Sequence, residues 1–190
     1  GDRFFECGHY NLVKSLGIDR FHLVGTAAGG FVAIDYALSF PNRLRGLVVA
    51  NSIGGVTDPD YLKLGRILRP PRFDALPPEI REVGPSYRAA NPQGTERWVE
   101  LERISRAPGP RVPAQPLRNQ ITFAMLEKIT APTFFLTGAA DLYAPPPLLK
   151  RFTDRVSNSR SAIIPEAGHS SYWENPELFN YFVLEFIRTH

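Results

Sequence analysis

The chain has very little sulfur: among its 190 residues there are one cysteine, Cys7, and one methionine. A single cysteine excludes an internal disulfide and is typical of a reducing compartment, so we expect a cytoplasmic protein. Long apolar runs are also lacking, because no stretch approaches the roughly 20 residues that span a bilayer. The first residues show no charged-then-apolar secretory pattern. These absences argue against a disulfide scaffold and against association with a membrane.

The sequence also lacks an excess of one charge, since 22 Lys and Arg residues face 19 Asp and Glu residues. The arginines are scattered instead of clustered, so the net charge of +3 predicts a solvated surface and no nucleic-acid partner. With 43% hydrophobic and 22% charged residues, the composition is that of an ordinary globular domain.

Short apolar runs alternate with segments of helical periodicity. Because buried parallel strands are continuously apolar, this alternation predicts a parallel α/β sheet flanked by helices. The predicted strands are 21–24, 44–50, 133–137 and 161–164, and the predicted flanking helices are 9–18, 28–40 and 176–187.

Between Gly54 and about Thr130 the alternation stops and prolines become frequent, including Pro70-Pro71 and Pro77-Pro78. Such a segment cannot form a central strand layer, so it predicts an inserted cap of short helices. The predicted cap helices are 59–68, 78–83, 94–106 and 117–128. We therefore divide the chain into a first core segment (1–54), the cap (55–130) and a second core segment (131–190).

The most informative motif is Gly25-Thr26-Ala27-Ala28-Gly29-Gly30, which directly follows the first predicted strand. It has the frame of a nucleophile elbow, G-x-S-x-G, with alanine in place of the serine. Glycine-rich turns also hold phosphates. However, position 27 is not the glycine of a dinucleotide-binding G-x-G-x-x-G, and the Gly-Lys-Ser/Thr of a P-loop is absent.

Two further candidates follow later strands. Asp141 comes just after the strand 133–137, and His169 comes just after the strand 161–164. Each could be structural, Asp141 as a turn or helix-cap residue and His169 as part of a Gly-His loop. Together with the elbow they stand in the order nucleophile, acid, histidine, and each lies where a strand ends, which is where reactive groups gather in open α/β sheets.

With these motifs the chain resembles an α/β-hydrolase-fold protein with a helical cap. The run Gly168-His169-Ser170-Ser171-Tyr172-Trp173-Glu174-Asn175-Pro176 is similar to the histidine loop of the meta-cleavage-product carbon–carbon bond hydrolases and related esterases. The resemblance implies a nucleophile site at position 27, with His169 as general base and Asp141 as its orienting acid. It also implies that the N–H of Ala28 forms half of the oxyanion hole, and that no cofactor or metal is needed.

One departure from that family is Ala27 itself, which has no nucleophilic oxygen. Thr26, Ser52, Ser170 and Ser171 are not placed to replace it, so we expect this form to be inactive. The alanine is either a deliberate Ser-to-Ala replacement or a natural loss. In the second case the chain would be a non-catalytic protein that binds or senses a small molecule.

A second departure is that the family's opening strands are missing. The strand 21–24 should then lie at a bare sheet edge, which is prone to aggregate. We expect the sheet to be completed by an absent N-terminal segment or by a second copy of the chain.

The substrate is less well defined by the sequence, and an ester, a lactone and a carbon–carbon (ketone) substrate all remain open. Aromatic residues near the predicted site favour an apolar or aromatic small molecule, although they could equally pack the cap onto the core. The candidate pocket residues are Tyr143, Trp173, Trp98 and Tyr61. Four cap arginines could hold a substrate carboxylate or lie in solvent, namely Arg66, Arg69, Arg72 and Arg88.

Overall fold

The computed structural model describes residues 8–106, 109 and 116–190, with side chains from residue 12 onward. Cys7 lies outside the described residues. Four strands form a parallel sheet, as predicted, although the fourth strand begins two residues before the predicted start. The strands pair in chain order. They are β1 (Phe21–Thr26), β2 (Leu44–Ala50), β3 (Thr133–Gly138) and β4 (Ser159–Ile164).

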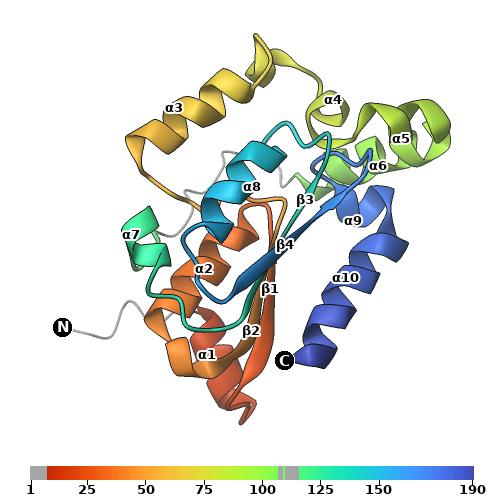
Figure 1. Ribbon diagram of the computed structural model, residues 1–190. Coiled ribbons are helices and arrows are strands. Elements are labelled where there is room, and N and C mark those ends of the chain that lie inside the picture. Colours follow the sequence, from red (N-terminus) through yellow and green to blue (C-terminus); the bar gives the residue numbers. More distant parts are fainter. Residues whose placement is uncertain (1–7, 107–108, 110–115) are drawn as a thin grey trace.

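Helices cover both faces of this sheet, which confirms the predicted α/β class (Figure 1). Helix α10 (Pro176–Thr189) lies on one face, while α2 (Gly29–Ser39) and α8 (Pro146–Thr153) lie on the other. Helix α1 (Gly8–Ser15) precedes β1. The remaining core elements are short: the 3-10 turn η1 (Pro41–Arg43) and helices α7 (Phe123–Leu126) and α9 (Ser171–Glu174).

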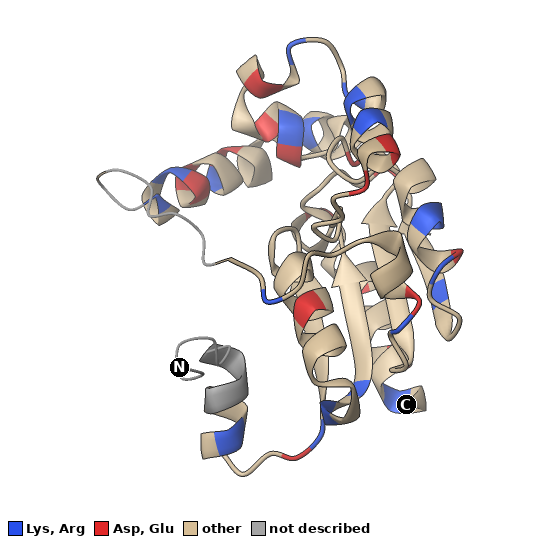
Figure 2. Ribbon diagram, turned by 90° about the vertical axis from the view of Figure 1, so that its left-hand side faces the viewer, with Lys and Arg blue, Asp and Glu red and all other residues tan. Residues whose placement is uncertain are grey.

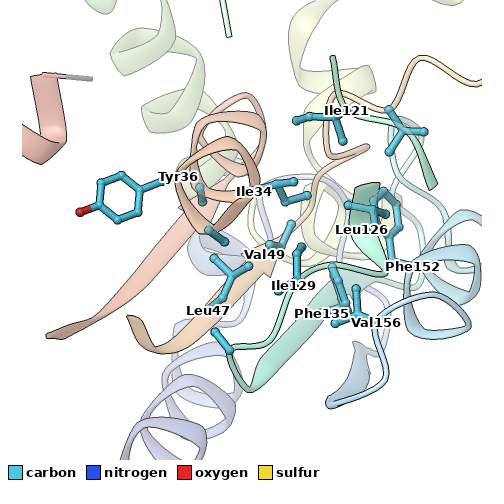
Figure 3. Packing of buried hydrophobic residues seen from close by; sticks show 14 of the residues in the cluster. Ile34, Tyr36, Leu47, Val49, Ile121, Leu126, Ile129, Phe135, Phe152 and Val156 are labelled. Carbon is cyan, nitrogen blue, oxygen red and sulfur yellow. The ribbon is translucent and has the colours of Figure 1, made fainter. Parts of the chain in front are cut away.

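The central strands are buried on both faces, which explains their continuous apolar sequence. In β2, Leu47 and Val49 face the cluster formed with α2 and α8, whereas Val48 and Ala50 face α10. Figure 3 shows Leu47 and Val49 of β2 among side chains from α2, β3 and α8. Because alternate residues of a strand point to opposite faces, one short run supplies both halves of the core.

Short helices lie across the end of the sheet at which the strands finish (Figure 1). Each begins with a proline in its first turn, where the missing N–H costs no hydrogen bond. The prolines that interrupt the strand pattern therefore start helices. These cap helices are α3 (Pro59–Leu68), α4 (Pro78–Glu82), α5 (Pro85–Ala90) and α6 (Pro92–Ser105), with the turn η2 (Phe73–Ala75) between α3 and α4.

The prediction of one helix over 117–128 was wrong, because only α7 is helical there. The backbone N–H groups of Arg118 and Asn119 instead donate to the carboxylate of Asp35 in α2, at 3.0 and 2.8 Å. A buried carboxylate that accepts these donors holds the returning chain in a non-helical conformation. The division of the chain into two core segments and a cap remains a prediction.

Strand β1 pairs only with β2 within the described part of the chain, and the side chain of Val24 on it is 41% exposed. That a further segment or a second copy of the chain covers this edge remains a prediction. Figure 2 shows acidic and basic residues interspersed over the cap helices, while the strands are almost free of charge. Of the helices that the structure describes, none is long and apolar enough to cross a membrane.

The turn between β1 and α2 depends on a glycine for close packing. A Cβ atom on Gly25 would lie 2.5 Å from the carbonyl oxygen of Gly29, whereas a Cβ on Gly29 would meet nothing within 4 Å. We therefore expect Gly25→Ala to lower the free energy of unfolding by about 1–3 kcal/mol, because backbone must move. Gly29→Ala, at the first residue of α2, is the matched control and should be neutral or stabilising by up to about 1 kcal/mol. Urea unfolding measures both, and equal effects would contradict this packing account.

Candidate active site

The three residues predicted to form the site all follow the carboxyl ends of strands. Ala27 follows β1 directly, Asp141 lies in the loop after β3, and His169 lies in the loop after β4. Because the strands are parallel, these loops emerge at the same edge of the sheet.

Ala27 has the backbone conformation of a sharp strand-to-helix turn. Its φ of 49° is left-handed, which is unfavourable for a residue with a Cβ. The turn is held because the Ala27 N–H donates to Ala50 O at 3.0 Å, and Ser52 Oγ donates to Ala27 O at 2.6 Å. The next residue, Ala28, is the N-cap of α2, and no backbone hydrogen bond of the described residues uses its N–H. The role of this N–H in an oxyanion hole remains a prediction.

Asp141 and His169 form a buried pair. Nδ1 of His169 lies 3.0 and 2.9 Å from the two carboxylate oxygens of Asp141, and the two residues are 9% and 1% exposed. Oδ1 of Asp141 also accepts from the N–H groups of Tyr143 and Ala144 at 2.8 and 2.9 Å. Oδ2 accepts from Thr137 Oγ1 at 3.1 Å. Residues at the end of β3 and in the loop after it thus fix the carboxylate by contacts that do not involve the histidine.

The electrostatics of the pair favour a charged histidine beside a charged aspartate. Burial acts to raise the pKa of Asp141, but attraction to His169 and the hydrogen bonds from His169, Ala144 and Asn51 outweigh it, so the pKa is lowered. Burial likewise acts to lower the pKa of His169, but Asp141 and, to a smaller extent, Glu82 raise it above the ordinary value. A base held in this way accepts a proton more readily than a free imidazole.

Asn51 is a residue of this site that the sequence analysis did not single out. It directly follows β2, is 0% exposed and has a left-handed φ of 48°. Its Nδ2 donates to Asp141 Oδ2 at 3.0 Å and to Gly168 O at 3.2 Å, and its Oδ1 accepts from Ser171 Oγ at 2.5 Å. One amide therefore joins the acid to the histidine loop. The sequence did contain a signal for it, because Asn51 follows a buried strand just as the other site residues do.

The histidine loop is tied to the cap. The carboxylate of Glu174 accepts from the N–H of Gly168 at 2.9 Å and from the N–H of Gly84, between α4 and α5, at 2.8 Å. Ser170 N donates to Glu82 O at 2.8 Å, and Trp98 Nε1 donates to Ser170 Oγ at 3.1 Å. Burial raises the pKa of Glu174, against the effect of these two N–H groups. The cap therefore helps to hold the loop of His169 in place.

The four candidate pocket residues lie in different places. The ring of Tyr143 lies 4.4 Å from that of His169, and Trp98 contacts the histidine loop through Ser170. Trp173 is in α9, and its Nε1 is buried without a hydrogen-bond partner. Tyr61 is placed elsewhere: it packs on Phe123 and Phe152 and lines a cavity of about 550 Å³ between α3 and α8.

The serine hydroxyls that could be considered as replacement nucleophiles are each engaged in a hydrogen bond. Ser52 is hydrogen-bonded to Ala27 O, Ser171 to Asn51 and Ser170 to Trp98. Within the described ranges no group of three or more His, Cys, Asp or Glu side chains converges on one point.

An α/β sheet with a left-handed turn after β1 and a buried Asp–His pair at the same edge is the arrangement of a hydrolase scaffold. Residues 5–180 match the model of the alpha/beta hydrolase family, and the chain belongs to this family.

Two relatives illustrate the range of activities named within this family. The chain is 31% identical to a protein described as a candidate carbamate hydrolase, RutD, of Caulobacter sp. strain K31. The match covers 93% of this chain and 68% of that protein. The chain is 29% identical to a 2-hydroxy-6-oxononadienedioate/2-hydroxy-6-oxononatrienedioate hydrolase of Burkholderia vietnamiensis. The match covers 93% of this chain and 65% of that hydrolase. The chain thus spans about two thirds of the length of these relatives.

Solved structures show the same fold. A thermophilic esterase from Thermogutta terrifontis superposes with a TM-score of 0.71 at 24% identity, covering 94% of this chain and 68% of the esterase. The 2-hydroxy-6-oxo-6-phenylhexa-2,4-dienoate hydrolase of Rhodococcus sp. RHA1 gives a TM-score of 0.69 at 20% identity, covering 95% and 68% of the two chains.

The charge of Asp141 should control the titration of His169. We expect Asp141→Asn to lower the pKa of His169 below its ordinary value, because burial remains while the main attraction to the imidazolium is gone. NMR titration of the imidazole C2–H, assigned with His169→Gln, measures this pKa. In the control Glu185→Gln, a surface carboxylate that pairs with Arg160 is removed and the pKa should not change. A His169 pKa in Asp141→Asn equal to or above that of the parent would contradict the assignment.

The stability of the fold should depend on the amide group of Asn51. Asn51→Asp keeps the shape and tolerates a left-handed φ, but it puts a second buried carboxylate against Asp141 and removes two N–H donors. We expect the free energy of unfolding to fall by about 3 kcal/mol at pH 8. The new carboxyl group has a raised pKa in the folded protein, so this loss should shrink as the pH falls and the group takes up a proton.

The matched control is Asn175→Asp, in which a helix N-cap keeps its acceptor for Leu178 N and stability should change by less than about 0.5 kcal/mol. Urea unfolding at pH 5 and pH 8 measures both variants. An equal loss at the two pH values would contradict the account from buried charge, and would assign the loss to the two missing N–H donors alone.

Proposed function

We propose that the chain is the scaffold of a hydrolase that acts on a small organic ester, lactone or carbon–carbon (ketone) substrate by Ser-His-Asp chemistry, and that it is inactive with Ala27 at the nucleophile position. The observation that carries the proposal is the buried Asp141–His169 pair, which keeps its hydrogen bonds at the sheet edge where Ala27 lies. The names of the relatives support the range of substrates, because they include carbamate and dienedioate hydrolases.

The chemistry follows from the orientation of the imidazole. With Nδ1 toward Asp141, Nε2 is the ring nitrogen available to accept a proton from a hydroxyl at position 27 and later to pass it to the leaving group. Asp141 fixes the tautomer and stabilises the imidazolium. The N–H of Ala28, at the start of α2, would stabilise the negative oxygen of the tetrahedral intermediate. None of these steps uses a cofactor.

The second candidate is a binding protein that uses the same scaffold without catalysis. The absence of a nucleophilic oxygen at Ala27 favours it. The Asp141–His169 pair argues against it, because a receptor needs neither a buried carboxylate nor an oriented base, and burying such a pair is costly.

Restoring the oxygen tests the proposal. We expect Ala27→Ser to raise turnover by on the order of 10⁶-fold, the cost typical of removing a catalytic serine, on 4-nitrophenyl acetate or on a vinylogous diketone. Release of nitrophenol and loss of the diketone absorbance measure this, both in this chain and in the chain extended to the length of its relatives.

Two controls isolate the mechanism. Ala27→Gly relieves the left-handed backbone but adds no oxygen, so it should stay inactive. Adding His169→Ala to Ala27→Ser should abolish the gain. Binding of substrate analogues with no turnover in any serine variant would favour the receptor, and full activity without His169 would overturn the assignment of the site.

A further inference from the structure

One residue of the cap contacts both loops that carry the Asp141–His169 pair. Glu82 is the last residue of α4, and its main-chain oxygen accepts from Ser170 N, in the loop after β4, at 2.8 Å. Its carboxylate accepts from the hydroxyl of Tyr143, in the loop after β3. The main chain and the side chain of a single cap residue thus hold two separate loops, one with the acid and one with the histidine.

Tyr143 is the residue through which this contact reaches the pair itself. Its N–H donates to Asp141 Oδ1 at 2.8 Å, and its ring lies 4.4 Å from the ring of His169 at an interplanar angle of 39°. Burial and the Glu82 carboxylate raise the pKa of Tyr143 to about 12, so the hydroxyl stays protonated and donates to Glu82. Tyr143 therefore contacts the acid with its main chain, the base with its ring and the cap with its hydroxyl.

The main chain of the cap lies directly against the histidine loop. A Cβ atom on Gly168 would lie 2.6 Å from Gly84 N and 3.0 Å from Glu82 O, so there is no space between the two segments. The carboxylate of Glu174 accepts from the N–H groups of both glycines and joins the same segments. Because close-packed main chains resist displacement, the fold fixes the position of Glu82 relative to His169.

The charge of Glu82 adds to that of Asp141 at the imidazole. Within the described ranges no Lys, Arg or His nitrogen lies within 4.0 Å of the Glu82 carboxylate, so no direct ion pair neutralises it. Burial lowers the pKa of His169, Asp141 and Glu82 raise it, and Arg69 lowers it. Glu82 thus acts in the same direction as the acid of the pair, and from the side of the cap.

Two arginines of the cap region oppose this effect. Cζ of Arg69 is 4.9 Å, and Cζ of Arg81 is 5.9 Å, from the ring centre of Phe73, which packs edge-on against Tyr143 at 4.8 Å. A cation near the base disfavours the imidazolium that proton transfer creates, and a carboxylate on the cap offsets it. The cap arginines named from the sequence that are exposed are Arg66 and Arg72.

We propose that Glu82 is a positioning residue through which the cap acts on the Asp141–His169 pair: its carbonyl holds the histidine loop while its carboxylate holds Tyr143 against the imidazole, so that docking of α4 orients the base. Its negative charge also favours the imidazolium. This inference rests on the proposed function, because orienting the base matters only if the base reacts. It adds to the triad a carboxylate that the cap supplies.

The test uses the chain as it is, because the titration of His169 can be measured without turnover. Glu82→Gln keeps the main-chain contact and an acceptor for Tyr143 but removes the charge, so we expect the pKa of His169 to fall. NMR titration of the imidazole C2–H, assigned with His169→Gln, measures it. Glu79→Gln is the matched control on the same helix: its main-chain oxygen, which accepts from Arg88 at 3.3 Å, is kept, and the pKa should not change.

Tyr143→Phe tests the path of the contact, because it removes the hydroxyl but keeps the ring and the N–H to Asp141. The Glu82 carboxylate is then no longer held, so Glu82→Gln should lower the pKa of His169 less in Tyr143→Phe than in the parent chain. A fall of equal size in both backgrounds would overturn the role of Tyr143. An unchanged pKa in Glu82→Gln, or an equal fall in Glu79→Gln, would overturn the proposal.

Melting curves identify any variant that does not fold. If Glu82→Gln is lost in this way, Glu82→Asp replaces it, since the aspartate keeps the charge but withdraws it by one methylene group. The pKa of His169 should then fall in the same direction by a smaller amount. An unchanged pKa in a folded Glu82→Asp protein would reject the proposal equally.

The Ala27→Ser protein provides a second readout. Adding Glu82→Gln should lower kcat on 4-nitrophenyl acetate several-fold with little change in KM, and the acidic limb of the pH profile should move to lower pH. The sign follows because a weaker base loses its proton at lower pH but accepts the serine proton less readily. A loss seen only in KM or only in the melting temperature would make Glu82 a binding or structural residue and would contradict the proposal.

The outcomes separate this inference from the proposed function. A serine variant that turns over substrate while the pKa of His169 is independent of Glu82 would keep the hydrolase and reject the positioning residue. A pKa of His169 that follows Glu82, without turnover in any serine variant, would keep the action of the cap on the pair and reject the hydrolase.

Discussion

The burial of one carboxylate, that of Asp141, is the constraint on which the site depends. A charged group that is 1% exposed is tolerated only if every lone pair is satisfied and an opposite charge is adjacent. Here the donors come from the end of β3, from the loop that follows it, from Asn51 after β2 and from His169 after β4. The hydrogen bonds to this carboxylate thus link the ends of three strands, β2, β3 and β4. The same hydrogen bonds that make its burial possible also orient the base.

The sequence was sufficient to predict a parallel sheet, because buried parallel strands are apolar on both faces. The order of the strands in space is known only from the structure. The elbow, Asp141 and His169 could be placed for the same reason: each follows such a strand. Asn51 follows a strand too, but an asparagine has many structural roles, and its partners Asp141 and Gly168 are 90 and 117 residues away. Only the folded chain reveals that its amide joins them.

The cap was harder to predict because its contacts are not periodic. Helical propensity alone suggested a helix over 117–128, yet the carboxylate of Asp35 from another helix captures the backbone there. Tyr61 shows a related limit: its aromatic character did not indicate that it packs on Phe123 and Phe152 in the core, and its role as a substrate-pocket residue remains a prediction. The placement of Arg69 and Arg81 on Phe73 likewise depends on the turn η2, which the sequence analysis did not predict.

The backbone conformation at position 27 helps to decide whether Ala27 belongs to a hydrolase scaffold or to a non-catalytic protein. A left-handed residue that is not glycine costs on the order of 1 kcal/mol or more, and such strain persists only where the surroundings impose it. Ala50 O and Ser52 Oγ impose it here, and both act on the main chain, so they hold the turn whether or not a side-chain oxygen is present. A chain freed from catalysis could relieve this strain with glycine and replace the buried pair with apolar residues. It has done neither, which supports our proposal that the scaffold is that of a hydrolase lacking a single oxygen atom.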